Sequence, residues 1–322
     1  MNIVRWIGNF ISSWIGAIII VLCLIFFIGQ GFIIPSRSMV GSLYEGDMMF
    51  VKKYFYGLTI PKIPWLEIPI LPDFHGNRHL IEGERPKRGD LVVFNPPGDD
   101  KTYYIKRTFA IGGDKVIFAK DGMYLRPFEG DAYIETNFKG YETKEFLGEK
   151  YIKEPYSREY KGIHYGEKDY RVKQFQSYEA MMYRMAGGTN NTLPNGNGIA
   201  MQPIVEDNMS INNYENNIPD FFYKEIAKDS FFMVGDNRDN SEDSRFWGVI
   251  DYSRIVGQPW FSYFSITLAD SIESGASDSI NRYKVRWERM FKSIETLQKE
   301  AKEFEGECRY YENHNCQLDV LY

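Results

Sequence analysis

Residues 102–125 read TYYIKRTFAIGGDKVIFAKDGMYL, two runs of aromatic and β-branched residues separated by a Gly-Gly-Asp turn. Runs of this kind, bounded by glycine and aspartate, are typical of short strands joined by tight turns. The same pattern occurs upstream in MMFVKKYFYG (48–57) and DLVVFNPPG (90–98). The sequence therefore predicts a mainly β fold with an antiparallel sheet.

The segment IPKIPWLEIPILPDF (60–74) lies between these strands and is rich in proline. Its prolines exclude a helix and a central strand, because proline donates no backbone hydrogen bond. Two interpretations are open. The segment either packs against the sheet as an apolar loop, or enters the headgroup region of a bilayer with Trp65 as an interfacial anchor.

The chain has 322 residues, a formal net charge of −6 and 43% hydrophobic residues. This charge excludes a dedicated nucleic-acid-binding protein, and the hydrophobic content is that of a folded chain. No charged residue occurs between Arg5 and Arg37. A purely soluble protein is therefore not expected.

The core of this uncharged stretch reads WIGAIIIVLCLIFFIG (14–29). With its flanks it exceeds the roughly 20 residues that span a bilayer. It is longer than the apolar part of a cleaved signal peptide, and no small-x-small cleavage pattern follows it. We therefore predict a short cytoplasmic tail over 1–8, one transmembrane helix over 9–33, and the rest of the chain outside.

A second helix is predicted near the C-terminus. Seven apolar residues follow the spacing of an amphipathic helix, which indicates core packing: Trp287, Met290, Phe291, Ile294, Leu297, Ala301 and Phe304. The basic residues Lys284, Arg286, Arg289 and Lys292 at its start are available to contact anionic lipid. Beyond the helix, Cys308 and Cys316 are close enough in sequence to be bridged in an oxidising compartment.

Three segments are dense in functional groups. They are IPSRSMVGSLYEGD (34–47), RGDLVVF with YIKR (88–94 and 104–107), and GDNRDNSEDSRFWG (235–248). The aspartates of the third do not form a calcium loop, since the required glycine and glutamate are missing. HGNRH (75–79) lacks the glutamate of a zinc-protease motif. We predict no metal and no cofactor.

A serine nucleophile needs a base, and a lysine can serve if burial keeps it neutral. Lys106 lies in a strand-like run between Tyr104, Ile105 and Phe109, surroundings that disfavour an ammonium. Lowering its pKa from about 10.4 to about 8 requires roughly 3 kcal/mol of differential stabilisation. Burial can supply this amount.

In their order behind the apolar run, the motifs PSxSM, RGDxxxF, YIKR and GDNRxNSxDSRxWG resemble those of bacterial signal peptidase I. Members of this family are membrane-bound serine proteases that remove signal peptides from exported preproteins. The resemblance covers the anchor, 32–114 and 231–257, under half of the chain. It does not cover the insert or the C-terminal tail.

The resemblance implies Ser38 as nucleophile, Lys106 as general base, and a Ser36 hydroxyl that joins the oxyanion hole. Ser241 would hydrogen-bond the amine of Lys106. Supporting ion pairs are implied between Asp236 and Arg107 and between Asp243 and Arg245. Shallow pockets would accept small side chains at the −1 and −3 positions of the cleavage site, lined by Phe32, Ile34, Pro35, Met39, Leu43, Tyr104 and Ile105.

The expected domains follow from these positions. The catalytic β core covers 34–125 and 230–270, an inserted β-rich accessory region covers 126–229, and the amphipathic helix and tail cover 271–322. One departure from the family pattern is visible, because members commonly carry SMxPTL where this chain has SMVGSL (38–43). Glycine in place of proline predicts a looser turn after the nucleophile.

We expect a single-pass protein of the bacterial inner (cytoplasmic) membrane, a monomer, with its catalytic domain on the periplasmic or external side. Its partners would be preproteins with signal peptides and the lipid bilayer, and no nucleic acid. Ser38 follows the predicted span by a few residues of at most about 3.3 Å each, so it would work near the bilayer surface. Two alternatives remain: a membrane-tethered β-rich scaffold or binding protein without catalysis, and a peptidase of the same clan dedicated to pilus or conjugation precursors.

Overall fold

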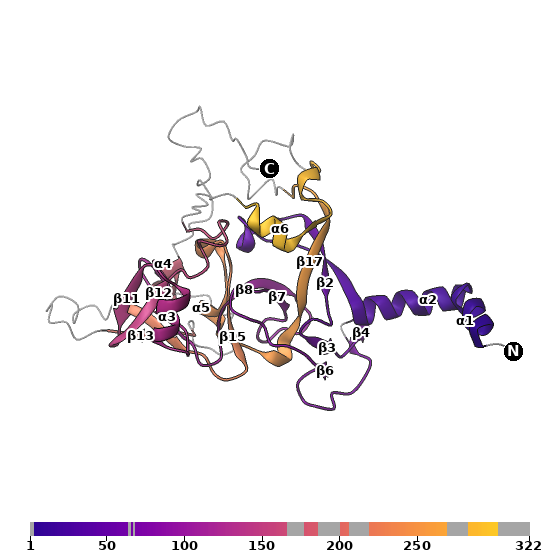
Figure 1. The fold of residues 1–322 in the computed structure, drawn as a ribbon, viewed down its shortest axis with the longest axis horizontal. Coiled ribbons are helices and arrows are strands. Elements are labelled where there is room, and N and C mark those ends of the chain that lie inside the picture. Colours follow the sequence, from indigo (N-terminus) through magenta and orange to yellow (C-terminus); the bar gives the residue numbers. More distant parts are fainter. Residues whose placement is uncertain are drawn as a thin grey trace.

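The computed structural model describes residues 3–63, 66, 68–165, 177–185, 200–205, 219–268 and 283–301. Across these residues the chain is mainly β, with two large antiparallel sheets and two short ribbons (Figure 1). The prediction of a mainly β, antiparallel fold is confirmed.

The first sheet contains the strands on either side of the three segments that are dense in functional groups. Its strand order is β1-β2-β17-β7-β8-β15-β16, with β18 paired to β17. It joins strands that are far apart in sequence, since β17 lies between β2 and β7. Its strands are β1 (Gly29–Ile33), β2 (Asp47–Lys52), β7 (Leu91–Phe94), β8 (Tyr104–Ile111), β15 (Ser230–Val234), β16 (Ile250–Asp251), β17 (Ile255–Ser265) and β18 (Lys292–Ser293).

The second sheet has the order β11-β12-β10-β9-β14-β13. Its strands are β9 (Lys115–Ala119), β10 (Gly122–Arg126), β11 (Thr143–Phe146), β12 (Glu149–Lys153), β13 (Gln202–Ile204) and β14 (Phe221–Glu225). The helices α3 (Asp131–Asn137) and α4 (Ser177–Met185) lie between these strands in the chain, and Met181 of α4 packs in the core with Phe118 and Phe222.

The stretch 102–125 passes from one sheet to the other. Strand β8 belongs to the first sheet, and the hairpin of β9 and β10 belongs to the second. Between them Gly113 has a φ of +93°, a conformation that glycine adopts readily. The second sheet therefore begins at Lys115 and not at residue 126, because β10 pairs with β12 and β9 pairs with β14 of the insert.

The proline-rich segment forms a small ribbon of β4 (Lys62–Ile63) and β5 (Ile68–Pro69), beside a second ribbon of β3 (Gly57–Thr59) and β6 (His79–Glu82). Leu66 is 57% and Phe74 73% accessible, whereas Ile60 is buried. The segment is therefore buried at its start and exposed in its middle and at its end, and both interpretations stay open. Trp65 lies outside the described residues.

The N-terminal residues form a stalk of short pieces instead of one helix (Figure 1). They are α1 (Ile3–Ile11), α2 (Trp14–Cys23) and a π-helical turn η1 (Leu24–Ile28), after which β1 pairs with β2. Among the residues described, no helix has the length and apolar character needed to cross a membrane. The single helix predicted over 9–33 is therefore not found.

Two local contacts account for this break. Ser13 Oγ accepts a hydrogen bond from Gly16 N–H, which starts a new helix at Trp14. The corner is tight, since a Cβ at Gly16 would lie 1.7 Å from Phe10 O. At the other end, residues 29–33 form strand β1, which pairs with β2 from Gly29↔Lys52 to Ile33↔Met48 and therefore cannot continue the helix.

The C-terminal helix is also shorter than the apolar spacing predicts. The structure has a 3-10 turn η5 (Trp287–Arg289), then β18, and a helix α6 of six residues (Ile294–Lys299). Phe291 has a left-handed φ of +57°, and Ser293 Oγ caps α6 by accepting from Thr296 N–H. Phe304, Cys308 and Cys316 lie outside the described residues.

Candidate active site

The proposed nucleophile and base come from two elements that the first sheet brings together. Ser38 lies in the 3-10 turn η2 (Arg37–Met39), just after β1, and Lys106 lies on β8. Lys106 Nζ is hydrogen-bonded to Ser38 Oγ, across 68 residues of sequence. Both side chains are buried, with Ser38 9% and Lys106 4% exposed.

The register of β8 explains how Lys106 reaches the turn. Val92 of β7 stands opposite Lys106, and Val234 of β15 stands opposite Arg107. Because successive side chains of a strand point to opposite faces, Lys106 and Arg107 serve different sides of the sheet. Lys106 meets Ser38 on one side, while Arg107 pairs with Asp236 on the other.

Burial gives Lys106 the electrostatic property that a base requires. Desolvation lowers the pKa of Lys106 to about 8, against the carboxylates of Asp243 and Asp236, which favour the ammonium. The ring of Tyr104 covers the amine, with its centroid 5.6 Å from Lys106 Nζ. About a tenth of the amine is therefore neutral at pH 7, far more than for an ordinary lysine.

Two further serines were predicted to assist. Ser36 is exposed, and its Oγ lies 3.5 Å from Ser38 Oγ. Ser241 is buried beside the nucleophile's backbone, but its Oγ has no hydrogen-bond partner among the residues that the structure describes. The contact expected between Ser241 and Lys106 is therefore not made. A Cβ at Gly235 would meet both Ser241 Oγ at 2.3 Å and Ser38 O at 2.5 Å, so only glycine permits this approach.

Both expected ion pairs are present and fully buried. Arg107 donates from Nε and Nη2 to Asp236 at 2.7 and 2.6 Å. Arg245, at the start of α5 (Ser244–Trp247), donates in the same bidentate way to Asp243 at 2.8 and 2.8 Å. Burial alone would raise the pKa of each carboxyl, but the facing guanidinium lowers it.

These ion pairs hold the 235–245 loop against the nucleophile. Asp243 also accepts from Gly235 N–H at 3.0 Å. Asn237 donates from its backbone N–H to Ser38 O at 3.2 Å and from its side chain to Arg37 O at 3.2 Å. The loop thereby fixes the backbone on both sides of the nucleophile's peptide unit.

Most of the residues expected to accept the substrate form one apolar cluster beside the dyad. Pro35 and Tyr104 are exposed at its edge, Tyr104 by 37%. The cluster contains Phe32, Ile34, Met39, Leu43 and Ile105, together with Met49, Leu91, Ile294 and Leu297.

The SMVGSL departure has a structural explanation. Gly41 has a φ of +100°, and a Cβ there would lie 2.1 Å from Gly162 O. Proline cannot adopt this φ, and any side chain would displace Gly162, which belongs to the insert. The turn is not loose, because Ser42 N–H and Leu43 N–H both donate to Met39 O. Ser42 Oγ also donates to Asp236 at 2.5 Å.

Sequence reasoning missed three contributors to this site, Asn237, Gly162 and the basic residues near the C-terminus. Arg286 and Arg289, which the sequence left available to contact anionic lipid, bind the buried Asp47. Desolvated carboxylates require such partners. The sequence signal for the contact with Gly162 was the presence of Gly41 and Ser42 where family members commonly carry proline and threonine. A residue that departs from a family motif can indicate a different neighbour in the structure.

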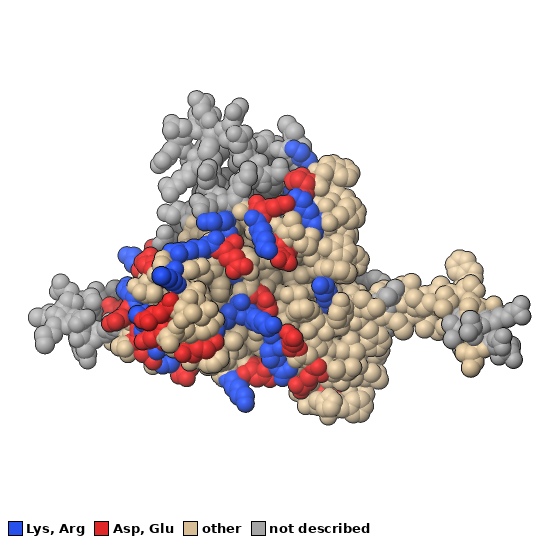
Figure 2. Space-filling model, viewed as in Figure 1, with Lys and Arg blue, Asp and Glu red and all other residues tan. Residues whose placement is uncertain are grey.

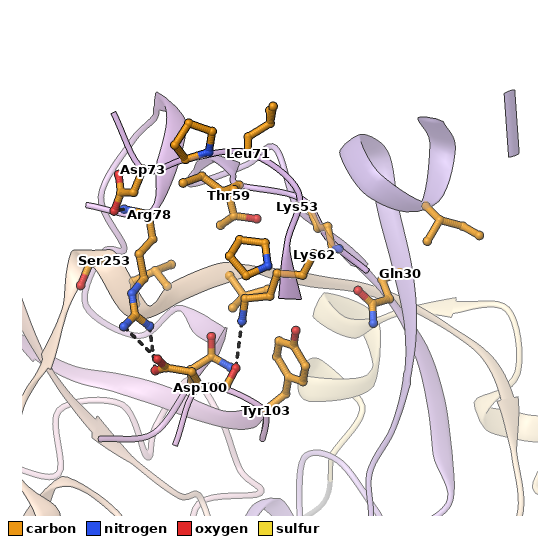
Figure 3. Close-up of a pocket in the computed structure, with 17 residues that line it drawn as sticks. Gln30, Lys53, Thr59, Lys62, Leu71, Asp73, Arg78, Asp100, Tyr103 and Ser253 are labelled. Atoms are coloured by element: carbon orange, nitrogen blue, oxygen red, sulfur yellow. Dashed lines mark hydrogen bonds and ion pairs between the residues drawn. The ribbon is translucent and has the colours of Figure 1, made fainter. Parts of the chain in front are cut away.

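A cavity of about 340 Å³ lies away from the dyad, where the stalk meets the first sheet. Figure 3 shows that Arg78 and Lys62 both point to Asp100, with Gln30 and Tyr103 on the side of the stalk. Neither Ser38 nor Lys106 lines it. Its chemistry is that of a surface ion-pair network, and it is separate from the candidate active site.

Comparison with known proteins shows the family of this chain. The family described as signal peptidase, peptidase S26, matches residues 7–264. Signal peptidase I of Helicobacter pylori strain 26695 is 51% identical over 303 residues, 93% of this chain and 97% of that protein. Signal peptidase I of Rickettsia bellii strain OSU 85-389 is 26% identical, over 89% of this chain and 86% of its own length.

A crystal structure of a signal peptidase I from Enterococcus faecalis is 18% identical and covers 54% of this chain and 97% of that one. Its TM-score of 0.23 is too low to bear on the fold. The family match and the Helicobacter relative both extend over most of the chain. This chain therefore belongs to the signal peptidase family, peptidase S26, and its activity is that of a signal peptidase.

Proposed function

We propose that this chain is a serine endopeptidase that cleaves N-terminal signal peptides from exported preproteins at small-x-small sites, with Ser38 as nucleophile and Lys106 as general base. The observation that carries the proposal is the hydrogen bond between Ser38 Oγ and the buried Lys106 Nζ. A serine and a lysine in contact, with the lysine desolvated, meet the requirements for an activated nucleophile.

The reaction begins with neutral Lys106. Ser38 Oγ attacks the carbonyl carbon of the scissile amide, and its proton passes to Lys106 Nζ. The C–N bond then breaks, and the Lys106 ammonium returns this proton to the departing amine. An acyl ester remains on Ser38 Oγ. Water attacks the ester carbonyl and gives a proton to Lys106. The bond between this carbonyl carbon and Ser38 Oγ then breaks, and the Lys106 ammonium returns the proton to Ser38 Oγ.

The surrounding groups stabilise this sequence. The exposed Ser36 hydroxyl, 3.5 Å from Ser38 Oγ, donates with the Ser38 N–H to the oxyanion of the tetrahedral intermediate. Ser241 is buried next to Gly235, where it lies close to the backbone of Ser38. The pairs Arg107–Asp236 and Asp243–Arg245 keep the 235–245 loop in place and do not themselves transfer protons.

The apolar cluster supplies the substrate pockets. Phe32, Ile34, Met39, Leu43 and Ile105, with Pro35 and Tyr104 at the edge, accept small side chains at positions −1 and −3. Larger side chains are excluded because the cluster is closely packed, and a clash or an unburied apolar group disfavours binding.

The chain works at the bacterial inner membrane as a monomer, anchored by its N-terminal apolar segment, with the β sheets on the periplasmic or external side. Trp14, Ile15 and Ile18 are 88%, 69% and 56% exposed, which is unfavourable in water and favourable in lipid. On the face that Figure 2 shows, charged residues gather over the second sheet, and the surface beside the stalk is largely uncharged, which supports this placement.

The test is preprotein cleavage in detergent by the full-length chain. Ser38→Ala, Lys106→Ala and Lys106→Arg should all be inactive, the last because a guanidinium does not deprotonate. Lys144→Ala, at an exposed lysine of the second sheet, is the matched control and should keep full activity. Normal turnover by any of the three dyad variants would refute the assignment.

The same experiment separates the alternatives. A serine-directed acylating reagent should label the wild type at Ser38 and leave Ser38→Ala unlabelled. A wild-type chain that neither cleaves preproteins nor takes the label would be a scaffold. Cleavage of pilus or conjugation precursors alone, from a panel that includes general exported preproteins, would indicate the dedicated peptidase.

A further inference from the structure

The segment 283–301 lies beyond the residues 7–264 that match the family, yet it contacts the candidate active site. Ile294 and Leu297 of α6 are 2% and 4% exposed. They belong to the same apolar cluster as Ile34, Met39 and Leu43. In Figure 1, α6 lies beside β17 and β2 on the side of the first sheet away from β3 and β6.

An ionic contact fastens this segment to the start of β2. Asp47 is fully buried and accepts from Arg289 Nη2 at 2.7 Å and from Ser265 Oγ at 2.6 Å. Arg286 Nη2 approaches the same carboxylate at 3.5 Å. Asp47 in turn accepts from Tyr44 N–H at 2.8 Å, which orients the turn that follows the nucleophile.

The two arginines also bind the backbone of that turn directly. Arg289 Nη2 donates to Ser42 O at 3.1 Å, and Arg286 Nη2 donates to Glu45 O. Met39 and Leu43, both fully buried, are thus restrained from two directions. The polar contacts hold the backbone on either side of the Leu43–Tyr44 pair, at Ser42 and Glu45. Ile294 and Leu297 of α6 pack in the same cluster as the side chains of Met39 and Leu43.

We propose that Ile294 and Leu297 are specificity-determining positioning residues, which set the depth of the pockets for the −1 and −3 side chains by supporting Met39 and Leu43. The inference rests on the proposed function. Protein interiors are close-packed, so Met39 and Leu43 can move away from the substrate only if the side chains packed against them leave space. Removing methyl groups at α6 creates that space.

The test uses the full-length chain with Leu297→Ala and Ile294→Ala, and preproteins that carry Ala, Val or Leu at −1 or at −3. Each variant should raise kcat/KM for Val or Leu, relative to Ala, by about tenfold, since one methylene in a pocket changes discrimination by roughly 10- to 200-fold. The milder Leu297→Val should shift the ratio in the same direction by a smaller factor.

Leu125→Ala is the matched control, because Leu125 is fully buried in the core cluster that includes Phe118 of the second sheet. It should lower the melting temperature by a similar amount and leave the ratio unchanged. The inference is overturned if Leu297→Val and both alanine variants keep the wild-type ratio, or if Leu125→Ala shifts it equally. A wild type that cleaves no preprotein would overturn the proposed function as well, so the two failures are distinguishable.

Discussion

At the residue scale, the proposed role of Lys106 as general base predicts the pH dependence of cleavage. Its buried amine has a pKa lowered to about 8, and only the neutral form accepts the proton of Ser38. We therefore expect kcat/KM for a short peptide substrate to rise about tenfold per pH unit below pH 8 and to level off above it. Initial rates from pH 6 to 9.5 in detergent measure this. A flat profile, or a midpoint near the ordinary lysine value, would contradict the assignment.

Gly41 is the residue at which the insert meets the nucleophile's turn. Gly41→Ala should destabilise the chain by about 1–2 kcal/mol for the left-handed backbone and by roughly 1–3 kcal/mol more for the clash with Gly162 O. A displacement of about 1 Å near Ser38 should also reduce kcat by about 100-fold. Melting temperature and initial rates on one preprotein measure both effects.

Gly148→Ala provides the control for this prediction. Gly148 also has a positive φ, of +74°, but a Cβ there meets nothing within 4 Å. The variant should show the backbone cost alone and keep full activity. If Gly148→Ala and Gly41→Ala lose the same stability and the same activity, the contact with Gly162 has no influence on the site.

At the scale of elements, the segment from η5 to α6 is held by one buried carboxylate. Arg289→Gln should lower the free energy of unfolding by about 3 kcal/mol, because it removes a partner from Asp47, which has no access to water. Lys292→Gln removes a half-exposed ion pair with Glu300 and should change stability by less than about 1 kcal/mol. Denaturant titration in detergent compares the two, and equal losses would show that Asp47 does not anchor the segment.

Strands were the elements that sequence pattern predicted best. Runs such as TYYIKRTFAI alternate between two buried environments and are bounded by glycine, so local preference and tertiary structure agree. Helices were predicted less well. The spacing from Trp287 to Phe304 favours one helix, but Phe291 adopts a left-handed φ and Ser293 starts a new element. Tertiary contacts of Arg286 and Arg289 outweigh the local periodicity.

The residues of the candidate site also divide into those that the sequence predicted and those that it did not. Ser38, Lys106 and the two ion pairs are carried by contiguous motifs, and the structure brings them together as the resemblance implies. The supports of Met39 and Leu43 come from residues more than 240 positions away, as in the pair of Arg289 with Asp47. Neither a motif nor a hydrophobic periodicity predicts such a contact, because it depends on the pairing of β17 with β2.

At the scale of the whole molecule, charged residues are unevenly distributed on the face that Figure 2 shows. The stalk, the ribbon of β4 and β5 and the largely uncharged surface beside α2 lie toward one end, and the charged second sheet lies toward the other (Figures 1 and 2). Ile68, Leu71 and Phe74 are 52%, 40% and 73% exposed on the ribbon and its loop. An apolar surface of this kind is expected to contact lipid headgroups and acyl chains.

This arrangement predicts that the ribbon assists cleavage only when the substrate is held in a membrane. Leu71→Glu combined with Phe74→Glu should reduce kcat/KM roughly tenfold for a preprotein embedded in proteoliposomes, because each glutamate resists entry into the interface. The same double variant should cleave a short soluble peptide at the wild-type rate, since neither residue belongs to the cluster beside Ser38. Leu147→Glu, at a residue 50% exposed on the second sheet, is the control and should affect neither substrate. Equal losses on both substrates would mean that the substitutions damage the catalytic domain, and no loss on either would mean that the ribbon does not enter the bilayer.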